Sequence, residues 1–227
     1  WSFIKYDAIN RVVFTGEASN GNDRPSLQAQ ANGSSGHHED RNNSWPVYYS
    51  LGNSYPTVNE SDVKAISYFD NHNNWPIGGL GFDGGSAFDY SFGSSIGFST
   101  GTRQRSRIDN SWLVTANYYD AKARMIQQLA QNAFGLIERT DLAYNFAGNI
   151  TKTRQQHKAQ NGNITLQLIE NDYDHVGRKT AVYQTINSGN REKIATYSHD
   201  AIGRQNQKKI LPDGNYTTGG VPASIIR

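Results

Sequence analysis

The stretch Tyr173-Asp174-His175-Val176-Gly177-Arg178 decides the fold, because its pattern recurs along the 227-residue chain. The pattern is Tyr-Asp-x-x-Gly-Arg, and the last four of its five copies lie 25 to 29 residues apart. Spacing of this kind is the mark of a tandem repeat. The residues that define the five copies are Tyr6, Asp7, Arg11, Tyr119, Asp120, Arg124, Tyr144, Asn145, Gly148, Tyr173, Asp174, Gly177, Arg178, Asp200, Gly203 and Arg204.

The six-residue pattern has the chemistry of a tight turn. Asp or Asn at the first turn position accepts hydrogen bonds from backbone N–H groups two residues further on. Gly three positions later takes a positive φ and closes a type I turn that is followed by a bulge. Asn10 suits that position in the first copy, and Ala123 suits it less well in the second. The motif therefore predicts a hairpin in which Tyr ends one strand and Arg begins the next.

The segments beside the turns have the pattern of strands. Apolar residues occupy every second position in residues 112–118 and 164–168, as expected for a half-buried strand. Residues 121–134 also contain good helix formers, with Met125 and Leu129 four residues apart. Their alignment with the repeat favours a strand over a helix. Because a lone hairpin is marginally stable, we expect the hairpins to pack side by side.

The repeat divides the chain into three parts. Residues 1–16 form a first hairpin, residues 17–110 a Gly-, Asn- and Ser-rich insertion, and residues 111–227 the tandem hairpins. We expect an all-β fold, with hairpins stacked into part of a curved sheet or shell wall. The chain begins at Trp1 instead of Met, and we expect it to be a piece of a longer protein.

Within the insertion, local patterns predict a mixture of short strands and irregular structure. Residues 47–50 and 65–70 favour strands, residues 20–43 an exposed loop, and residues 78–101 a glycine-rich irregular segment. A structureless loop of this length is unusual in a compact domain.

The composition excludes several classes of protein. Hydrophobic residues make up 36% of the chain, and no apolar run approaches the roughly 18 residues of a spanning helix. We therefore expect no membrane insertion. The absence of cysteine excludes a disulfide scaffold and a Cys nucleophile. The formal net charge is only +2, with short basic clusters at residues 103–107 and 152–158, so we expect no nucleic-acid partner.

The Tyr-Asp-x-x-Gly-Arg recurrence over residues 1–16 and 112–215 resembles the YD-repeat, or Rhs, family. This family includes bacterial Rhs toxin carriers, the C component of insecticidal toxin complexes and the teneurin shell. The insertion is similar to that of Bacteroidetes-type Rhs surface proteins, with Tyr68-Phe69-Asp70 in place of a strand ending in Tyr-Tyr-Asp. The resemblance implies a hollow β-shell that encloses or presents a C-terminal effector, often a toxin.

The resemblance also implies partners and a location, but no catalytic residue. The family's autoproteolytic core begins Asp-Pro-x-Gly-Arg, whereas Leu211-Pro212-Asp213-Gly214 has its Pro before its Asp and lacks the Arg. The implied partners are the rest of a parent chain or a capping partner, and a C-terminal toxin cargo. The implied location is extracellular or the bacterial cell surface.

Short matches to site motifs favour neither an enzyme nor a metal protein. Residues 79–84 match G-x-G-x-x-G and residues 93–97 match G-x-S-x-G, but no helix pattern follows either one, as both motifs require. His and carboxylate residues at 37–40, and the pair Asp70 and His72, have metal-binding chemistry in segments typical of exposed loops. The repeat carboxylates are expected in a row, one per hairpin, and not as a catalytic pair. We expect no cofactor.

Aromatic residues of the insertion offer the main alternative function, surface glycan binding or adhesion. Trp45, Tyr48 and Trp75 lie near Asn and Gly residues, and exposed rings beside planar polar groups suit the apolar faces of sugars. Large aromatic side chains also fill cores beneath long loops. A shell predicts that the repeat Tyr rings lie buried in a row, whereas a glycan binder predicts an exposed aromatic platform in residues 45–82.

Overall fold

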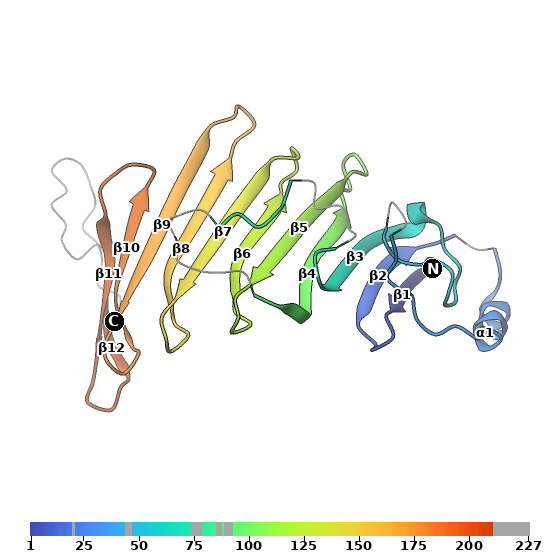
Figure 1. The fold of residues 1–227 in the computed structure, drawn as a ribbon, viewed down its shortest axis with the longest axis horizontal. Helices are drawn as coiled ribbons and strands as arrows, with labels where there is room; N and C mark the ends of the chain where they lie inside the picture. Colours follow the sequence, from blue (N-terminus) through green and yellow to red (C-terminus); the bar gives the residue numbers. More distant parts are fainter. Residues whose placement is uncertain (20, 44–46, 74–78, 85–87, 89–92, 211–227) are drawn as a thin grey trace.

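The computed structural model describes residues 1–19, 21–43, 47–73, 79–84, 88 and 93–210. These residues form one antiparallel sheet of twelve strands that follow one another in chain order (Figure 1). The strands are β1 Ser2–Tyr6, β2 Val12–Glu17, β3 Val63–Asp70, β4 Ser95–Arg105, β5 Trp112–Tyr119, β6 Met125–Gln131, β7 Ile137–Tyr144, β8 Ile150–Lys158, β9 Ile164–Tyr173, β10 Lys179–Ile186, β11 Glu192–His199 and β12 Gln205–Ile210. The predicted all-β class, built from stacked hairpins, is confirmed.

The sheet is open, and each inner strand pairs with the strands before and after it in the sequence. Consequently the turns alternate between two edges of the sheet. The five motif turns all lie along one edge, at the bottom of Figure 1, which we call the motif edge. Register shifts occur where the strands enter these turns, for example between Tyr118 and Tyr119, as expected for a turn followed by a bulge.

The ambiguous segment 121–134 contains strand β6, which confirms the strand prediction. Its helix formers do not decide its structure, because β6 pairs with β5 on one side and β7 on the other. Tertiary pairing of this kind overrides intrinsic helix propensity, which is a weak preference.

Two long excursions leave the sheet, residues 18–62 between β2 and β3 and residues 71–94 between β3 and β4. Helix α1 of the first excursion lies beyond the β1 end of the sheet in Figure 1. The exposed loop predicted over residues 20–43 is wrong for part of this range, where helix α1, Arg24–Asn32, forms. The Asp23 side chain caps the N-terminus of this helix by accepting a hydrogen bond from Ser26 N. A short 3-10 helix, η1 Glu60–Asp62, leads into β3.

The strand predictions inside the insertion have mixed outcomes. The strand expected over residues 65–70 is confirmed within β3. The strand expected over residues 47–50 is wrong, because only an isolated bridge joins Arg41 and Tyr49, and the positive φ of Tyr48 interrupts an extended chain. The irregular segment expected over residues 78–101 is wrong from Ser95 onward, where β4 begins.

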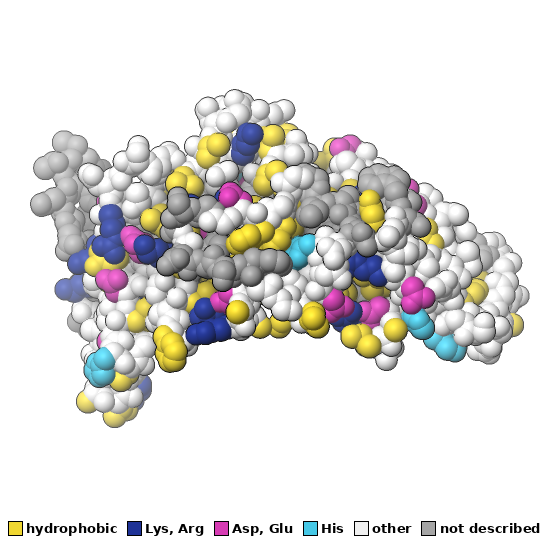
Figure 2. Space-filling model, viewed as in Figure 1, with side chains coloured by type: hydrophobic (Ala, Val, Ile, Leu, Met, Phe, Trp, Pro, Cys, Tyr) yellow, Lys and Arg dark blue, Asp and Glu magenta, His cyan; other side chains and the backbone are white. Residues whose placement is uncertain are grey.

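The hydrophobic core lies between the first half of the sheet and the excursions. Phe14 and Tyr68 of the sheet pack against Tyr49 of the first excursion, and the Tyr118 hydroxyl donates to the Leu80 carbonyl of the second. Figure 2 shows the molecule from the same side, with apolar side chains of described residues in the middle of this face. From β8 to β12 the described buried apolar residues are few and small: Ala181, Val182 and Ala195. No helix in the described ranges is long and apolar enough to cross a membrane.

Candidate functional site: joints along the motif edge

Each motif turn is held by the side chain of its own first residue, which is Asp in four copies and Asn145 in the other. In the turn of residues 174–178, Asp174 N donates to the Arg178 carbonyl at 2.9 Å, and Gly177 N donates to the Asp174 carbonyl at 3.0 Å. Asp174 Oδ1 accepts from the backbone N–H groups of Val176 and Arg178, and Oδ2 accepts from Arg178 Nε at 2.6 Å. The Asp therefore closes the turn and also fixes the Arg side chain.

The same geometry recurs in the other copies. The distances from the Asp carboxylate to Arg Nε are 2.6 Å for Arg11, 2.7 Å for Arg124 and 2.8 Å for Arg204. In the Asn145 copy, Asn149 stands in place of Arg and donates only its backbone N–H to the Asn145 side chain. The fourth turn position has a positive φ in every copy, at Asn10, Ala123, Gly148, Gly177 and Gly203.

The charge of the motif carboxylates is stabilised where they lie. Burial by itself raises the pKa of Asp120, but hydrogen bonds from Arg124 and from two backbone N–H groups outweigh burial and hold this pKa below its usual value. The pKa of Asp174 is lowered in the same way by Arg178. Asp120 and Asp174 are therefore each held in the charged form by the Arg of their own turn.

The turn at Asp120 and the next turn, at Asn145, are connected by reciprocal contacts; we call such a connection a joint. The guanidinium carbon of Arg124 lies 4.6 Å from the centre of the Tyr144 ring, and Arg124 Nη1 donates to the Asn145 carbonyl at 3.2 Å. The Tyr144 hydroxyl donates back to the carbonyl of Met125, the residue after Arg124, at 2.7 Å. A joint thus connects the Arg of one turn to the aromatic-Asp pair of the next.

The repeat tyrosines form a row, each reaching the strand before its own. The Tyr119 hydroxyl donates to Ser99, that of Tyr144 to Met125 and that of Tyr173 to Ile150, always to a backbone carbonyl at 2.7 to 2.8 Å. The three rings are half-buried, whereas a shell predicts buried rings. Tyr6, in the first copy, is 39% exposed.

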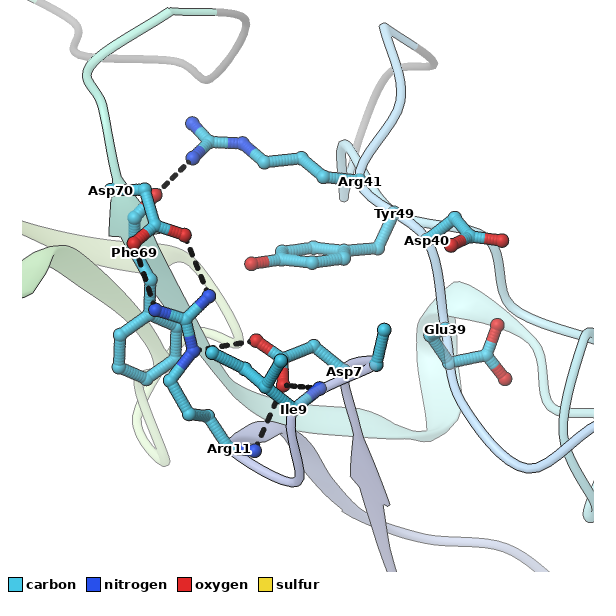
Figure 3. A pocket seen from close by; sticks show the side chains of 10 residues that line it. Asp7, Ile9, Arg11, Glu39, Asp40, Arg41, Tyr49, Phe69 and Asp70 are labelled. Carbon is cyan, nitrogen blue, oxygen red and sulfur yellow. Dashed lines mark hydrogen bonds and ion pairs between the residues drawn. The ribbon is translucent and has the colours of Figure 1, made fainter. Parts of the chain in front are cut away.

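A second joint involves a turn that the repeat pattern does not reveal. Arg11 donates through both terminal nitrogens to Asp70, at 2.9 and 2.6 Å, and its guanidinium lies over the Phe69 ring at 4.3 Å (Figure 3). Gly97, with a φ of 86°, donates its N–H to Asp70 Oδ1. Phe69, Asp70 and Gly97 therefore form a motif turn that is interrupted by residues 71–94. Phe69-Asp70 at the end of a strand was the available signal.

This interrupted joint borders a cavity of about 290 Å³. Figure 3 shows Arg41 and Tyr49 of the first excursion on its other side, with Arg41 donating to the Phe69 carbonyl. Glu39, at the same cavity, is paired with buried Lys5 at 2.5 Å. Arg11 pairs with both Asp7 and Asp70, while the contacts of Glu39 and Arg41 attach the first excursion to the sheet.

The residues with metal-binding chemistry, which were not predicted to form a site, have separate partners. Glu39 points inward to Lys5, while His38 lies 3.4 Å from the exposed carboxylate of Asp40. His72 stacks on the Tyr118 ring, away from Asp70, which is held by Arg11. Across the part of the chain that the structure describes, no group of three or more His, Cys, Asp or Glu residues is arranged to hold a metal ion.

The remaining candidates from the sequence are the two glycine motifs and the residues proposed for glycan binding. Residues 93–97 lead into strand β4, and most of the residues that directly follow residues 79–84 lie outside the described ranges. Among the proposed glycan-binding residues, Tyr48 is half-buried, and Trp45 and Trp75 lie outside the described residues.

Two further turns of the motif's backbone geometry lie on the opposite edge of the sheet. Gly135 N donates to the Asn132 carbonyl, and Gly162 N donates to the Ala159 carbonyl, with positive φ at both glycines. Sequence reasoning missed them, although the Asn-x-x-Gly spacing at residues 132–135 was visible. They lack the Asp and Arg, which explains why they do not belong to the joints.

Comparisons with known proteins do not place the chain in a family. No family model matches it, and no curated protein sequence matches it significantly.

Proposed function

We propose that this chain is part of a non-enzymatic scaffold of the Rhs/YD-repeat type. In this role the stacked hairpins form the wall of a larger β-shell that encloses or presents a C-terminal effector at the cell surface or in a secreted particle. The observation that supports the proposal most strongly is the joint, by which Arg124 reaches the turn at Asn145 and Arg11 reaches the turn at Asp70 along the motif edge. A joint stabilises the packing of neighbouring hairpins in a long continuous sheet, and it does so without a ligand.

The energetics of the joints suit a wall that is extended by repetition. A guanidinium over an aromatic ring contributes about 0.5–1 kcal/mol at exposed sites, and one hydrogen bond contributes about 0.5–1.5 kcal/mol net. Each joint therefore adds roughly 1–2 kcal/mol between neighbouring hairpins. In a sheet whose strands pair only with their sequence neighbours, stability grows as the sum of such nearest-neighbour contacts.

The open sheet also supports a partner beyond the described residues. An unpaired strand exposes backbone N–H and C=O groups that invite association. We infer that the rest of a parent chain or a capping partner covers at least one end, and that a C-terminal toxin is the cargo.

The direct test is the mass and size of the native protein that carries this segment, combined with limited proteolysis. The proposal predicts a particle several times larger than 25.2 kDa, with a protease-resistant wall and a separable C-terminal piece. A closed monomer close to this mass, without a separable piece, would contradict it.

A further inference from the structure

The last motif turn of the series has its Arg, Arg204, but no described residue supplies a ring for this Arg to contact. Arg204 is paired with Asp200 in its own turn, as in the other copies, but its side chain is 76% exposed. The equivalent arginines Arg11, Arg124 and Arg178 are 23%, 27% and 33% exposed. Among the described residues no aromatic-Asp pair follows Arg204, so the ring-binding face of its guanidinium is open to solvent.

The strand that follows Arg204 is equally open. β12 pairs with β11 on one side, and all six of its residues are exposed. Its outer edge carries Lys208 and Lys209, and lysines on an edge strand oppose unselective pairing with other chains. Any strand that pairs there stably must therefore complement these charges.

The opposite end of the sheet is not equivalent. The Tyr6 carbonyl of β1 accepts a hydrogen bond from Glu39 N at 2.8 Å. In the second copy the Tyr119 carbonyl accepts from Gly93, in the segment that leads into the preceding strand β4. Glu39 thus occupies, at β1, the place of a preceding strand. The first excursion thus contacts this end of the edge, whereas no described residue pairs with the outer side of β12.

We propose that β12 binds, in trans, a hairpin whose first strand ends in an aromatic-Asp pair. This inference rests on the proposed scaffold function and names its docking surface. The partner ring covers the Arg204 guanidinium, as Tyr144 covers Arg124. The Tyr173 hydroxyl donates to Ile150, the first residue of the strand after the preceding turn. The partner's hydroxyl donates likewise to the carbonyl of Gln205.

Charge selects among such hairpins. In the chain itself, β9 lies beside β8 with Glu170 opposite Lys152 and a separation of 3.6 Å between their charged groups. A hairpin docked on β12 in the same register places the residue equivalent to Glu170 opposite Gln207, next to Lys208 and Lys209. The preferred partner is therefore a repeat hairpin with acidic residues just before its aromatic-Asp pair.

The test uses the full chain and a synthetic peptide of residues 164–186, which carries Glu170, Tyr173 and Asp174. Titration of the labelled peptide, followed by fluorescence anisotropy, should show saturable binding. Arg204→Ala should weaken binding by about fivefold or more, because a ring contact and its geometry are lost. Arg107→Ala, which removes an exposed arginine at the opposite edge, is the matched control and should leave binding unchanged.

A second variant separates the ring contact from charge. Arg204→Lys keeps the charge but loses the planar guanidinium, and a Tyr173→Ala peptide loses the ring. Both should weaken binding, and circular dichroism should show an unchanged fold for the chain variants. The proposal is overturned by absence of peptide binding, or by binding equal for the native chain and Arg204→Ala. Either outcome leaves the internal joints, and hence the scaffold proposal, to be judged by their own measurements.

Discussion

The fourth position of the motif turn allows a reciprocal test of the turn geometry. Ala123 has a φ of 63° there, and the equivalent Gly148 has a φ of 87°. A left-handed conformation costs a residue other than Gly about 1–2 kcal/mol, whereas a new Gly loosens the unfolded chain by about 0.4–1 kcal/mol. Ala123→Gly should therefore raise the free energy of unfolding by roughly 0.5–1 kcal/mol.

The reverse change should have the opposite sign. A Cβ at Gly148 meets no atom within 4 Å, so Gly148→Ala tests backbone strain without a steric clash. It should lower the free energy of unfolding by roughly 0.5–1 kcal/mol. Ala147→Gly is the control, because Ala147 lies one residue earlier without a positive φ and should only lose stability.

The assay is urea denaturation followed by circular dichroism, with linear extrapolation to water. The four proteins should rank Ala123→Gly, native, Gly148→Ala in decreasing stability, with Ala147→Gly also below native. A destabilised Ala123→Gly together with an unaffected Gly148→Ala would refute the assignment of strain to this turn position.

Three other perturbations follow from the structure. Gly93→Ala places a Cβ 2.5 Å from backbone atoms of the turn at Asp120 and should cost about 1–3 kcal/mol in urea melts, whereas Gly81→Ala, with open space around it, should cost much less. The pKa of Asp120 is lowered in the folded chain, so its contribution is present above about pH 4 and lost as the pH falls further; Asp120→Asn should flatten that acid slope in a pH series of unfolding free energies. Burial raises the pKa of Tyr68 and Tyr118 to about 12. The free energy of unfolding should therefore fall as the pH rises from about 10 through 12, while tyrosinate absorbance rises over the same range.

The tandem hairpins could be predicted because the residues that specify each turn and strand lie close together in the sequence. Asp174, Gly177 and Arg178 close one turn with contacts no more than four residues apart, and the period-two pattern beside it is visible in any single repeat. Even for the helix-like segment containing Met125, alignment with the other repeats predicted a strand, and the segment contains strand β6.

The parts that sequence reasoning missed depend on distant or exposed residues. Gly97 completes the turn of Asp70 from 27 residues away, so no local pattern reveals it. Helix α1 has no buried residue and therefore no apolar periodicity, although Asp23 before Pro25 was a usable start signal. The contact of Arg124 with Tyr144 connects two repeats, and its presence follows only from the strand register.

The central claim is that joints connect neighbouring hairpins, and a double-mutant cycle between Arg124 and Tyr144 tests it most directly. Arg124→Met keeps the aliphatic stem without the guanidinium, and Tyr144→Leu removes the ring and hydroxyl. The account predicts a coupling energy of about 1 kcal/mol in the free energy of unfolding. The control cycle pairs Arg124→Met with Tyr197→Leu on β11, where coupling should stay below about 0.5 kcal/mol. Equal coupling in the two cycles would contradict the account.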